Sequence, residues 1–214
     1  MVNIAVIGGT GYAGRNIVAA AAQRGHSVTA FSRTAPAEPV AGVSYVQGSV
    51  FDDAVLASAF DGADVVISAL APRGELDGKL LGVVEKLETL SGSTGTRLGV
   101  MGGAGSLLAY PDGPKLFDTD EFPAEFKGES LQMDAVLTSL RNQSADVDWF
   151  YVSPGAGFGP WAAGEATGTY RVGGDVLLAN DSGESHISGA DLGDAFAAEI
   201  EAPAHTRERF TVAY

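Results

Sequence analysis

A cluster of glycines directly after the first apolar segment constrains the fold of this chain more than any other feature. Residues 3–7 form a nearly continuous aliphatic run, the pattern of a strand buried on both faces of a parallel sheet. An alanine-rich helical stretch begins at residue 13. A glycine turn between such a strand and helix brings backbone N–H groups and the positive helix end against a pyrophosphate. The pattern predicts a dinucleotide site rather than an ordinary left-handed turn, with these candidate residues: Gly8, Thr10, Gly11, Tyr12, Ala13 and Gly14.

The rest of the chain alternates between strand-like and helix-like segments. We expect further strands at 27–31, 43–46, 63–70, 97–101 and 147–152, and helices at 13–24, 53–60, 76–90, 129–141 and 192–200. Short strand-like pieces follow at 169–172, 176–179 and 210–213. This alternation is typical of an α/β fold with a doubly wound parallel sheet, the Rossmann architecture.

The length favours one domain. With 214 residues and 45% hydrophobic residues, the chain can bury a single core. We expect residues 1–153 to form the dinucleotide-binding core and residues 154–214 a small, integrated portion on the substrate side. A sheet of this kind binds ligands at the carboxyl ends of its strands.

Composition excludes several classes of protein. A net charge of -14 disfavours nucleic acid and anionic membrane surfaces as partners. The absence of cysteine and the wide spacing of three histidines argue against a metal site. The longest uncharged stretch, 149–164, is short and broken by Pro and Gly, so no transmembrane segment is predicted. With no leader pattern at residue 1, we expect a cytoplasmic protein, as a monomer or a homodimer.

The end of the second predicted strand indicates which cofactor is preferred. An NAD-selective site carries Asp or Glu there for the ribose 2′-hydroxyl, but this chain has Ser32 and Arg33. A guanidinium can pair bidentately with a 2′-phosphate, and the serine hydroxyl can donate to it. The sequence therefore favours NADPH, with NADH as an alternative; in the competing interpretation Arg33 is only a solvated strand end.

Five segments of the chain resemble one family. Residues 8–14, 61–70, 97–107, 148–154 and 170–175 are similar to the atypical short-chain dehydrogenase/reductases. Within these, the glycine-rich segment 102–106 and segment 170–175 resemble the NAD(P)H-binding group that includes NADH-flavin reductases, biliverdin reductase B and NmrA-like proteins. The resemblance covers nearly the whole chain and implies a Rossmann fold and an NAD(P)H-linked function.

The resemblance also implies further site residues. Many relatives carry Gly-Asp at the end of the third strand to meet the adenine, and this chain has Ser49 and Val50 there. Other positions implied to contact the cofactor follow the fourth and sixth strands: Ala69, Leu70, Ala71, Pro154 and Gly155. Ser106 is implied to lie near the nicotinamide, and Tyr110 is a second catalytic candidate. Each has a structural alternative, Ser106 as a turn residue and Tyr110 as a loop anchor.

The chain lacks the catalytic Tyr–Lys pair of ordinary alcohol dehydrogenases, and two functional hypotheses are compatible with that absence. No tyrosine in the chain is followed four residues later by lysine, the pair that protonates a carbonyl oxygen. The first hypothesis is a reductase that passes hydride to a flavin, a quinone or another planar acceptor, with flavin as a substrate rather than a resident cofactor. The second is a non-catalytic NmrA-like redox sensor that acts through a protein partner.

Overall fold

A single mixed sheet runs through the computed structural model, which describes residues 1–144 and 146–214. In this part of the chain eight strands follow the order β3-β2-β1-β4-β5-β6-β8-β7, and every adjacent pair is parallel except β7 with β8. The strands are β1 (Asn3–Ile7), β2 (Ser27–Ser32), β3 (Ser44–Gln47), β4 (Val65–Ser68), β5 (Arg97–Met101), β6 (Trp149–Pro154), β7 (Arg171–Gly173) and β8 (Glu208–Ala213). The predicted doubly wound α/β fold is confirmed.

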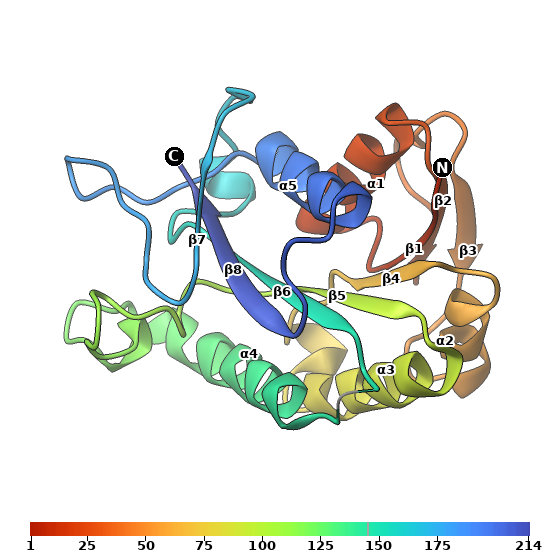
Figure 1. Ribbon diagram of the computed structural model, residues 1–214, viewed down its shortest axis with the longest axis horizontal. Coiled ribbons are helices and arrows are strands. Elements are labelled where there is room, and N and C mark those ends of the chain that lie inside the picture. The colour runs from red at the N-terminus through yellow and green to blue at the C-terminus, as the bar shows by residue number, and fades with distance from the viewer. Residues whose placement is uncertain (145) are drawn as a thin grey trace.

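Helices cover both faces of this sheet. Figure 1 shows α1 and α5 on one face and α2, α3 and α4 on the other. Their bounds are α1 (Tyr12–Gln23), α2 (Asp53–Phe60), α3 (Leu80–Thr94), α4 (Ala124–Asn142) and α5 (Gly189–Glu201), with short 3-10 helices η1 (Gly74–Leu76), η2 (Leu116–Asp118) and η3 (Pro160–Ala162). Among the described helices, none is long and apolar enough to cross a membrane.

The β1 strand shows why its run of apolar residues suits this position. Ala5 and Ile7 belong to the core beneath α2, α3 and α4, whereas Ile4 and Val6 belong to the core beneath α1 and α5. Successive side chains of a strand point to opposite faces, so a strand covered on both sides must be apolar throughout.

The helices α1 and α5 pack at unusually short range. A Cβ at Gly189 would lie 2.4 Å from the Asn16 side-chain amide nitrogen, and a Cβ at Gly193 would lie 2.4 Å from the Asn16 carbonyl oxygen. Only glycine permits this approach. The C-terminal helix thereby fixes the helix that follows the glycine loop.

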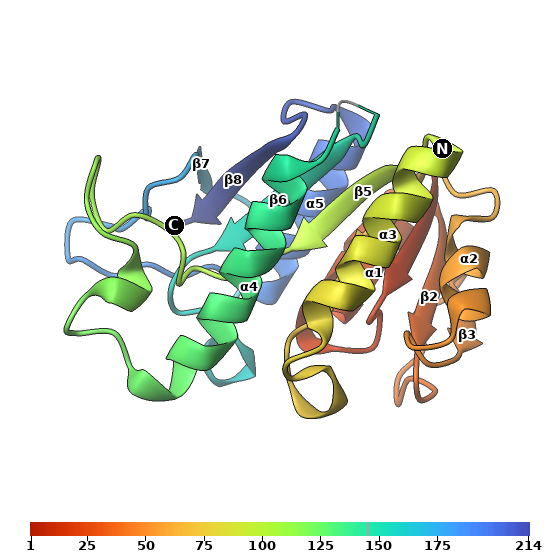
Figure 2. The same ribbon diagram turned by 90° about the horizontal axis from the view of Figure 1, so that it is seen from below.

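Parallel strands end along one edge of the sheet. In Figure 2 the arrowheads of β1, β2, β5, β6 and β8 point in the same general direction. The chain reverses its direction of winding between β1 and β4, because β2 and β3 lie on one side of β1 and β4, β5 and β6 on the other. A crevice at this reversal is where such sheets bind ligands.

Some expected elements differ from the structure. The predicted helix 76–90 begins instead at Leu80, after the separate turn η1, and the predicted helix 129–141 begins earlier, at Ala124. The strand expected at 176–179 is wrong: Val176 makes only an isolated bridge with Leu108. Two hydrogen bonds make this bridge: the Leu108 amide donates to the carbonyl of Asp175, and the Leu177 amide donates to the carbonyl of Leu108. The Asp175 carboxylate, just before the bridge, pairs with Arg209.

Candidate functional site

A cavity of about 860 Å³ lies where the parallel strands end. Loops after β1, β2, β3, β4, β5 and β6 all contribute to its wall, together with the first turns of α1 and α4. One end is lined by residues that follow β2 and β3, and the other by residues of the loops after β5 and β6. Its volume falls within the usual range of ligand sites.

The glycine loop forms the floor of this cavity next to β1. Gly8 has a φ of 84°, and a Cβ there would lie 2.7 Å from the carbonyl oxygen of Ala69. A Cβ at Gly14 would lie 2.1 Å from the carbonyl oxygen of Gly8, so α1 could not begin so close to the loop with any other residue. The amides of Gly8 and Gly9 both donate to the carbonyl of Phe31 at 2.9 and 3.1 Å, which ties the loop to β2.

The N-terminus of α1 is left free for a ligand. Its N-cap is Gly11, and no side chain caps the helix. The first amides of a helix have no internal acceptor and carry the positive end of its dipole. Tyr12, the first residue of the helix, packs beside this end: its ring centroid is 5.2 Å from that of Phe158 and 5.4 Å from the Arg15 guanidinium. An uncapped helix end in a backbone cradle fits the pyrophosphate of a dinucleotide.

Arg33 lies at the end of the cavity formed by β2 and β3. Its Nη1 is 3.1 Å from Oε2 of Glu75, and both side chains are 68% exposed. The Ser32 hydroxyl donates to the Thr34 carbonyl at 2.7 Å. Ser49 lines the same end, and its hydroxyl accepts from the Phe51 amide at 3.3 Å. This end therefore offers a guanidinium and two hydroxyls next to one carboxylate.

The segment 71–79 crosses from β4 to α3 and is tied to α4. Arg73 donates from Nε and Nη2 to the two carboxylate oxygens of Glu129, at 2.8 and 3.0 Å. Gln132 donates to Asp77 at 2.8 Å and accepts from the Gly78 amide at 2.7 Å. Glu75 therefore sits on a segment that contacts the rims on both sides of the cavity.

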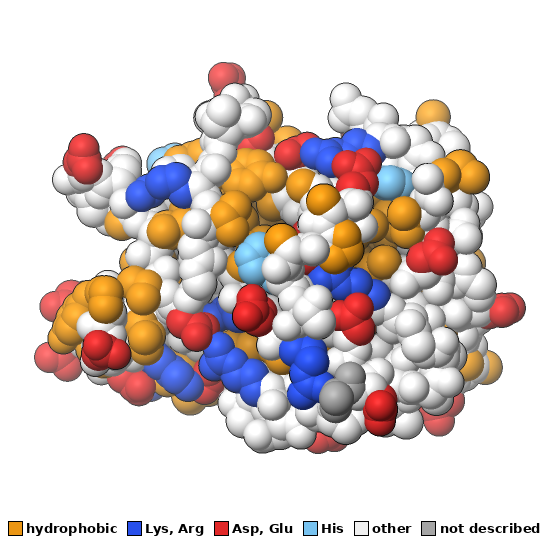
Figure 3. Space-filling view, viewed as in Figure 1, with side chains coloured by type: hydrophobic (Ala, Val, Ile, Leu, Met, Phe, Trp, Pro, Cys, Tyr) orange, Lys and Arg blue, Asp and Glu red, His pale blue; other side chains and the backbone are white. Residues whose placement is uncertain are grey.

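The other end of the cavity is apolar and aromatic. Phe126 at the start of α4 and Trp161 in η3 have ring centroids 6.1 Å apart and an interplanar angle of 13°. Trp161 is 62% exposed, so its ring lies at the mouth of the cavity. In Figure 3 hydrophobic side chains gather at the lower left, over the segment between β5 and α4 in Figure 1. Further lining residues at this end are Leu116, Phe122, Pro123, Met133, Phe158 and Pro160.

Ser106 and Tyr110, the two catalytic candidates, do not line the cavity. The Ser106 side chain is buried, and its hydroxyl accepts from Nη1 of Arg209 at 2.9 Å. Tyr110 is 60% exposed, and its carbonyl accepts from the amide of Gly113 in a tight turn. Neither residue therefore reaches the cavity, although the glycines of segment 102–105 just before Ser106 line it.

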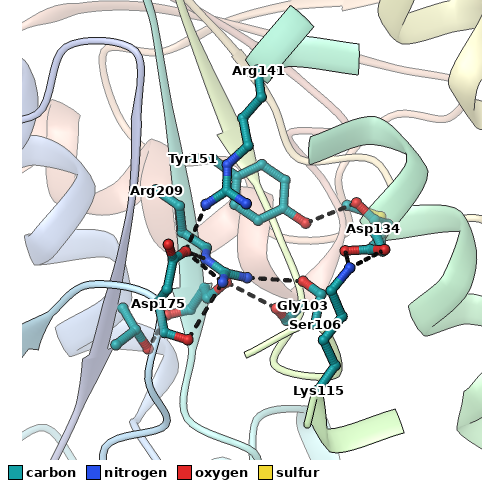
Figure 4. A network of polar contacts seen from close by, with 11 residues as sticks. Gly103, Ser106, Lys115, Asp134, Arg141, Tyr151, Asp175 and Arg209 are labelled. Carbon is teal, nitrogen blue, oxygen red and sulfur yellow. Dashed lines mark hydrogen bonds and ion pairs between the residues drawn. The ribbon is translucent and has the colours of Figure 1, made fainter. Parts of the chain in front are cut away.

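A polar network supports this segment from behind (Figure 4). Arg209 on β8 pairs with Asp175, which also pairs with Arg141 at 2.7 Å. Burial by itself raises the pKa of Asp175, but the charges of Arg209 and Arg141 outweigh it and hold the pKa below its ordinary value. The loop after β5 is therefore anchored by charges outside the cavity.

Tyr151 belongs to the same support. Its hydroxyl donates to the Met133 carbonyl at 3.2 Å, and a Cβ at Gly102 would lie 2.0 Å from its ring. Burial raises the pKa of Tyr151 far above its usual value. The residue is fully buried and does not line the cavity, so it packs the loop rather than exchanging protons with a ligand.

The residues predicted to contact the cofactor meet at the cavity with one exception. Gly14 lies behind the loop against Gly8, and the others line the wall: Gly8, Thr10, Gly11, Tyr12, Ala13, Ser32, Arg33, Ser49, Val50, Ala69, Leu70, Ala71, Pro154 and Gly155. Sequence reasoning missed Arg73, Glu75, Glu129, Ser130 and Met133. The position of Glu75 after a parallel strand was an available signal. The three α4 residues had none: they lie within the helix expected at 129–141, but nothing local in the sequence shows that this helix reaches the cavity.

The fold and this site define a dinucleotide-binding protein with a Rossmann architecture. The chain belongs to the NAD(P)H-binding family, which it matches over residues 8–203.

Relatives of similar length share the whole fold. The chain is 36% identical over 211 residues to the uncharacterized protein YwnB of Bacillus subtilis (strain 168), covering 98% of this chain and 97% of YwnB. A solved "putative exported protein" of Burkholderia pseudomallei is 38% identical with a TM-score of 0.88 and full coverage of both chains. A "putative NADH-flavin reductase" of Streptococcus pneumoniae TIGR4 is 33% identical with a TM-score of 0.87, covering 100% of this chain and 99% of the other.

Proposed function

We propose that this protein is an NADPH-preferring reductase that transfers hydride to a planar acceptor such as a flavin or a quinone. The observation that carries the proposal is the shape of the cavity, which continues past the glycine loop into the aromatic end at Phe126 and Trp161. The similarity to a protein named as an NADH-flavin reductase points in the same direction.

The proposed binding of NADPH rests on the glycine loop and on the end of the cavity formed after β2 and β3. The free amides of α1 and the loop from Gly8 to Gly11 take the pyrophosphate, as their geometry suits an anion. Arg33 and Ser32 take the 2′-phosphate, because a guanidinium pairs with phosphate through two parallel hydrogen bonds. Ala69 to Ala71 after β4, and Pro154 and Gly155 after β6, line the cavity and bound the space for the nicotinamide in this proposal.

The acceptor half needs few reacting groups. In the proposed reaction NADPH supplies a hydride, the acceptor ring takes it together with one proton from solvent, and NADP⁺ leaves. Among the described residues that line the cavity none is a lysine, and Tyr12 is packed between Phe158 and Arg15. The described cavity lining therefore lacks the Tyr–Lys pair that protonates a carbonyl oxygen, while aromatic rings are suited to hold a flat acceptor against the nicotinamide.

A binding titration followed by turnover in the same sample tests this proposal. NADPH and NADH are titrated by nicotinamide fluorescence, and then FMN or a quinone is added while nicotinamide absorbance is recorded. We expect tighter binding of NADPH than of NADH, acceptor-dependent oxidation, and about 10- to 100-fold weaker NADPH binding in Arg33→Ala, because an Arg–phosphate pair is a strong, bidentate interaction. Lys127→Ala removes the same charge from an exposed position on α4 and serves as the control.

Two results would contradict the proposal. Absence of nicotinamide binding would remove its basis. Tight binding that distinguishes NADP⁺ from NADPH, with no oxidation by any planar acceptor, would instead identify the redox sensor.

A further inference from the structure

The Arg33–Glu75 pair brings together two residues that come from different loops and favour different cofactors. Arg33 follows β2, and Glu75 lies in η1 after β4. They meet at 3.1 Å at the end of the cavity shared by Ser32, Thr34 and Ser49. An NAD site usually has its carboxylate at the end of the second strand. That position is Ser32-Arg33 here. In the structure the carboxylate of Glu75, from η1, lies beside Arg33 instead.

From this geometry we infer that Glu75 sets the ratio of NADPH to NADH binding by competing with the 2′-phosphate for Arg33. The inference rests on the proposed binding of the cofactor with its adenosine ribose at this end. The Arg33–Glu75 pair is exposed, so water and salt screen it. Arg33 can therefore leave Glu75 for a partner that binds it more strongly. A phosphate monoester carries nearly two negative charges and can take both arms of the guanidinium.

Glu75 acts in opposite directions on the two cofactors. With NADPH, Arg33 must release the carboxylate, and Glu75 then lies beside the incoming phosphate as a like charge, which weakens binding. With NADH, no phosphate competes, and the Glu75 carboxylate is placed to accept a hydrogen bond from the free ribose hydroxyl. Glu75 therefore reduces the preference for NADPH over NADH, which would be larger with Arg33 alone.

The position of Glu75 is held by the rest of its segment. Gly74 adopts a φ of 60°, and on each side of η1 the chain is tied to α4 through Arg73 and through Asp77 and Gly78. Glu75 therefore reaches Arg33 from a backbone that is anchored elsewhere. Its replacement by glutamine removes the charge while preserving side-chain size and the segment's own anchors.

The test measures dissociation constants for NADPH and NADH by nicotinamide fluorescence, without any acceptor, in the wild-type protein, Glu75→Gln, Arg33→Ala and the double variant. We expect Glu75→Gln to tighten NADPH binding about 3- to 10-fold and to weaken NADH binding, with a smaller effect at about 0.5 M salt because the interaction is screened. In the Arg33→Ala background only the like-charge repulsion remains, so the effect of Glu75→Gln on NADPH should be smaller than in the wild-type background. Glu85→Gln, an exposed carboxylate on α3 outside the cavity, is the matched control for net charge.

The outcomes separate this inference from the proposed function. If Arg33→Ala weakens NADPH but Glu75→Gln leaves the ratio within about twofold of wild type, the competition is wrong and the cofactor assignment stands. An equal effect of Glu75→Gln with and without Arg33 would also overturn the competition. If Arg33→Ala leaves NADPH binding unchanged, or neither nicotinamide binds, the proposed cofactor site fails and the inference fails with it.

Discussion

The hydroxyl of Ser106 accepts a hydrogen bond from Nη1 of Arg209 at 2.9 Å, and both side chains are buried. This contact joins the loop after β5 to β8, near the C-terminal end of the chain (Figure 4). Because the arginine is also paired with Asp175, its charge is balanced within the network. Ser106 does not line the cavity itself; it helps to hold segment 102–105, which does.

Removal of this hydroxyl should affect stability more than chemistry. In Ser106→Ala one buried arm of Arg209 loses its partner, which costs about 1–3 kcal/mol. We expect urea unfolding at a lower midpoint and an NADPH oxidation rate within about threefold of wild type, since the hydroxyl is outside the cavity. A loss of about 100-fold in kcat with unchanged stability would place Ser106 among the reacting groups instead.

The glycine at the start of α1 should be intolerant of any side chain. Gly14→Ala places a Cβ at 2.1 Å from the Gly8 carbonyl oxygen, so the loop or the helix must move. We expect a loss of about 1–3 kcal/mol in stability and at least about tenfold weaker nicotinamide binding. The measurements are urea unfolding and fluorescence titration.

Gly82→Ala is the matched control for this glycine change. Gly82 lies in α3, is exposed, and a Cβ there meets nothing within 4 Å. Alanine should therefore raise helix stability by up to about 1 kcal/mol without affecting binding. If both variants behaved alike, the close approach at Gly14 would not be the cause.

The sequence predicted the strands and the glycine loop because their signals are local. A strand covered on both faces must be apolar at every position, as β1 is, and the turn into α1 requires glycine wherever a Cβ would strike backbone. The candidate contacts at the end of β2 followed from the usual position of the residue that recognises the ribose. Those after β4 and β6 were implied by the family resemblance, and they agree with the rule that parallel strands end along one edge of the sheet.

The residues that sequence reasoning missed depend on tertiary contacts. The place of Glu75 after a parallel strand was a local signal that it lies near the cavity. Its position beside Arg33 depends on the anchoring of segment 71–79 to α4, which no local pattern encodes. The strand expected at 176–179 failed for a related reason. Its four residues are apolar, but Asp175 is held by Arg209 and the chain forms only one bridge, at Val176. Long-range partners overrode local preference in both places.

Trp161 should affect the acceptor without affecting the cofactor. Its ring stacks on that of Phe126 at the aromatic end, and it lies in η3 after β6, whereas Arg33 follows β2. Trp161→Ala removes a stacking surface, so we expect KM for FMN or a quinone to rise about 3- to 10-fold while the NADPH dissociation constant stays within about twofold. Stability should change by less than about 0.5 kcal/mol, since the side chain is mostly exposed. Trp161→Phe should recover most of the loss, and an unchanged KM in Trp161→Ala would remove this residue from the acceptor site.

A buried carboxylate between α3 and α4 gives a prediction with a definite dependence on pH. Glu88 is buried; its Oε2 accepts from Ser139 at 2.9 Å and Gln143 at 2.6 Å, while Oε1 has no partner. Burial raises the pKa of Glu88 above its usual value, and the two hydrogen bonds offset this only in part. The folded state therefore holds the proton more tightly than the unfolded state, in which the pKa is about 4.3. Stability contributed by this group is lost as the pH rises from that value through the folded pKa.

Glu88→Gln should remove this penalty. A glutamine oxygen can still accept from Ser139 and Gln143, and the neutral amide avoids burying a charge. We expect the variant to exceed wild type by about 0.5–1 kcal/mol in unfolding free energy at pH 7.5, and to match it near pH 4, where the wild-type carboxyl is protonated. Urea unfolding of both proteins at these two pH values measures the difference. A variant less stable than wild type at pH 7.5 would show that the charged carboxylate stabilises the contact between α3 and α4, contrary to the argument from burial.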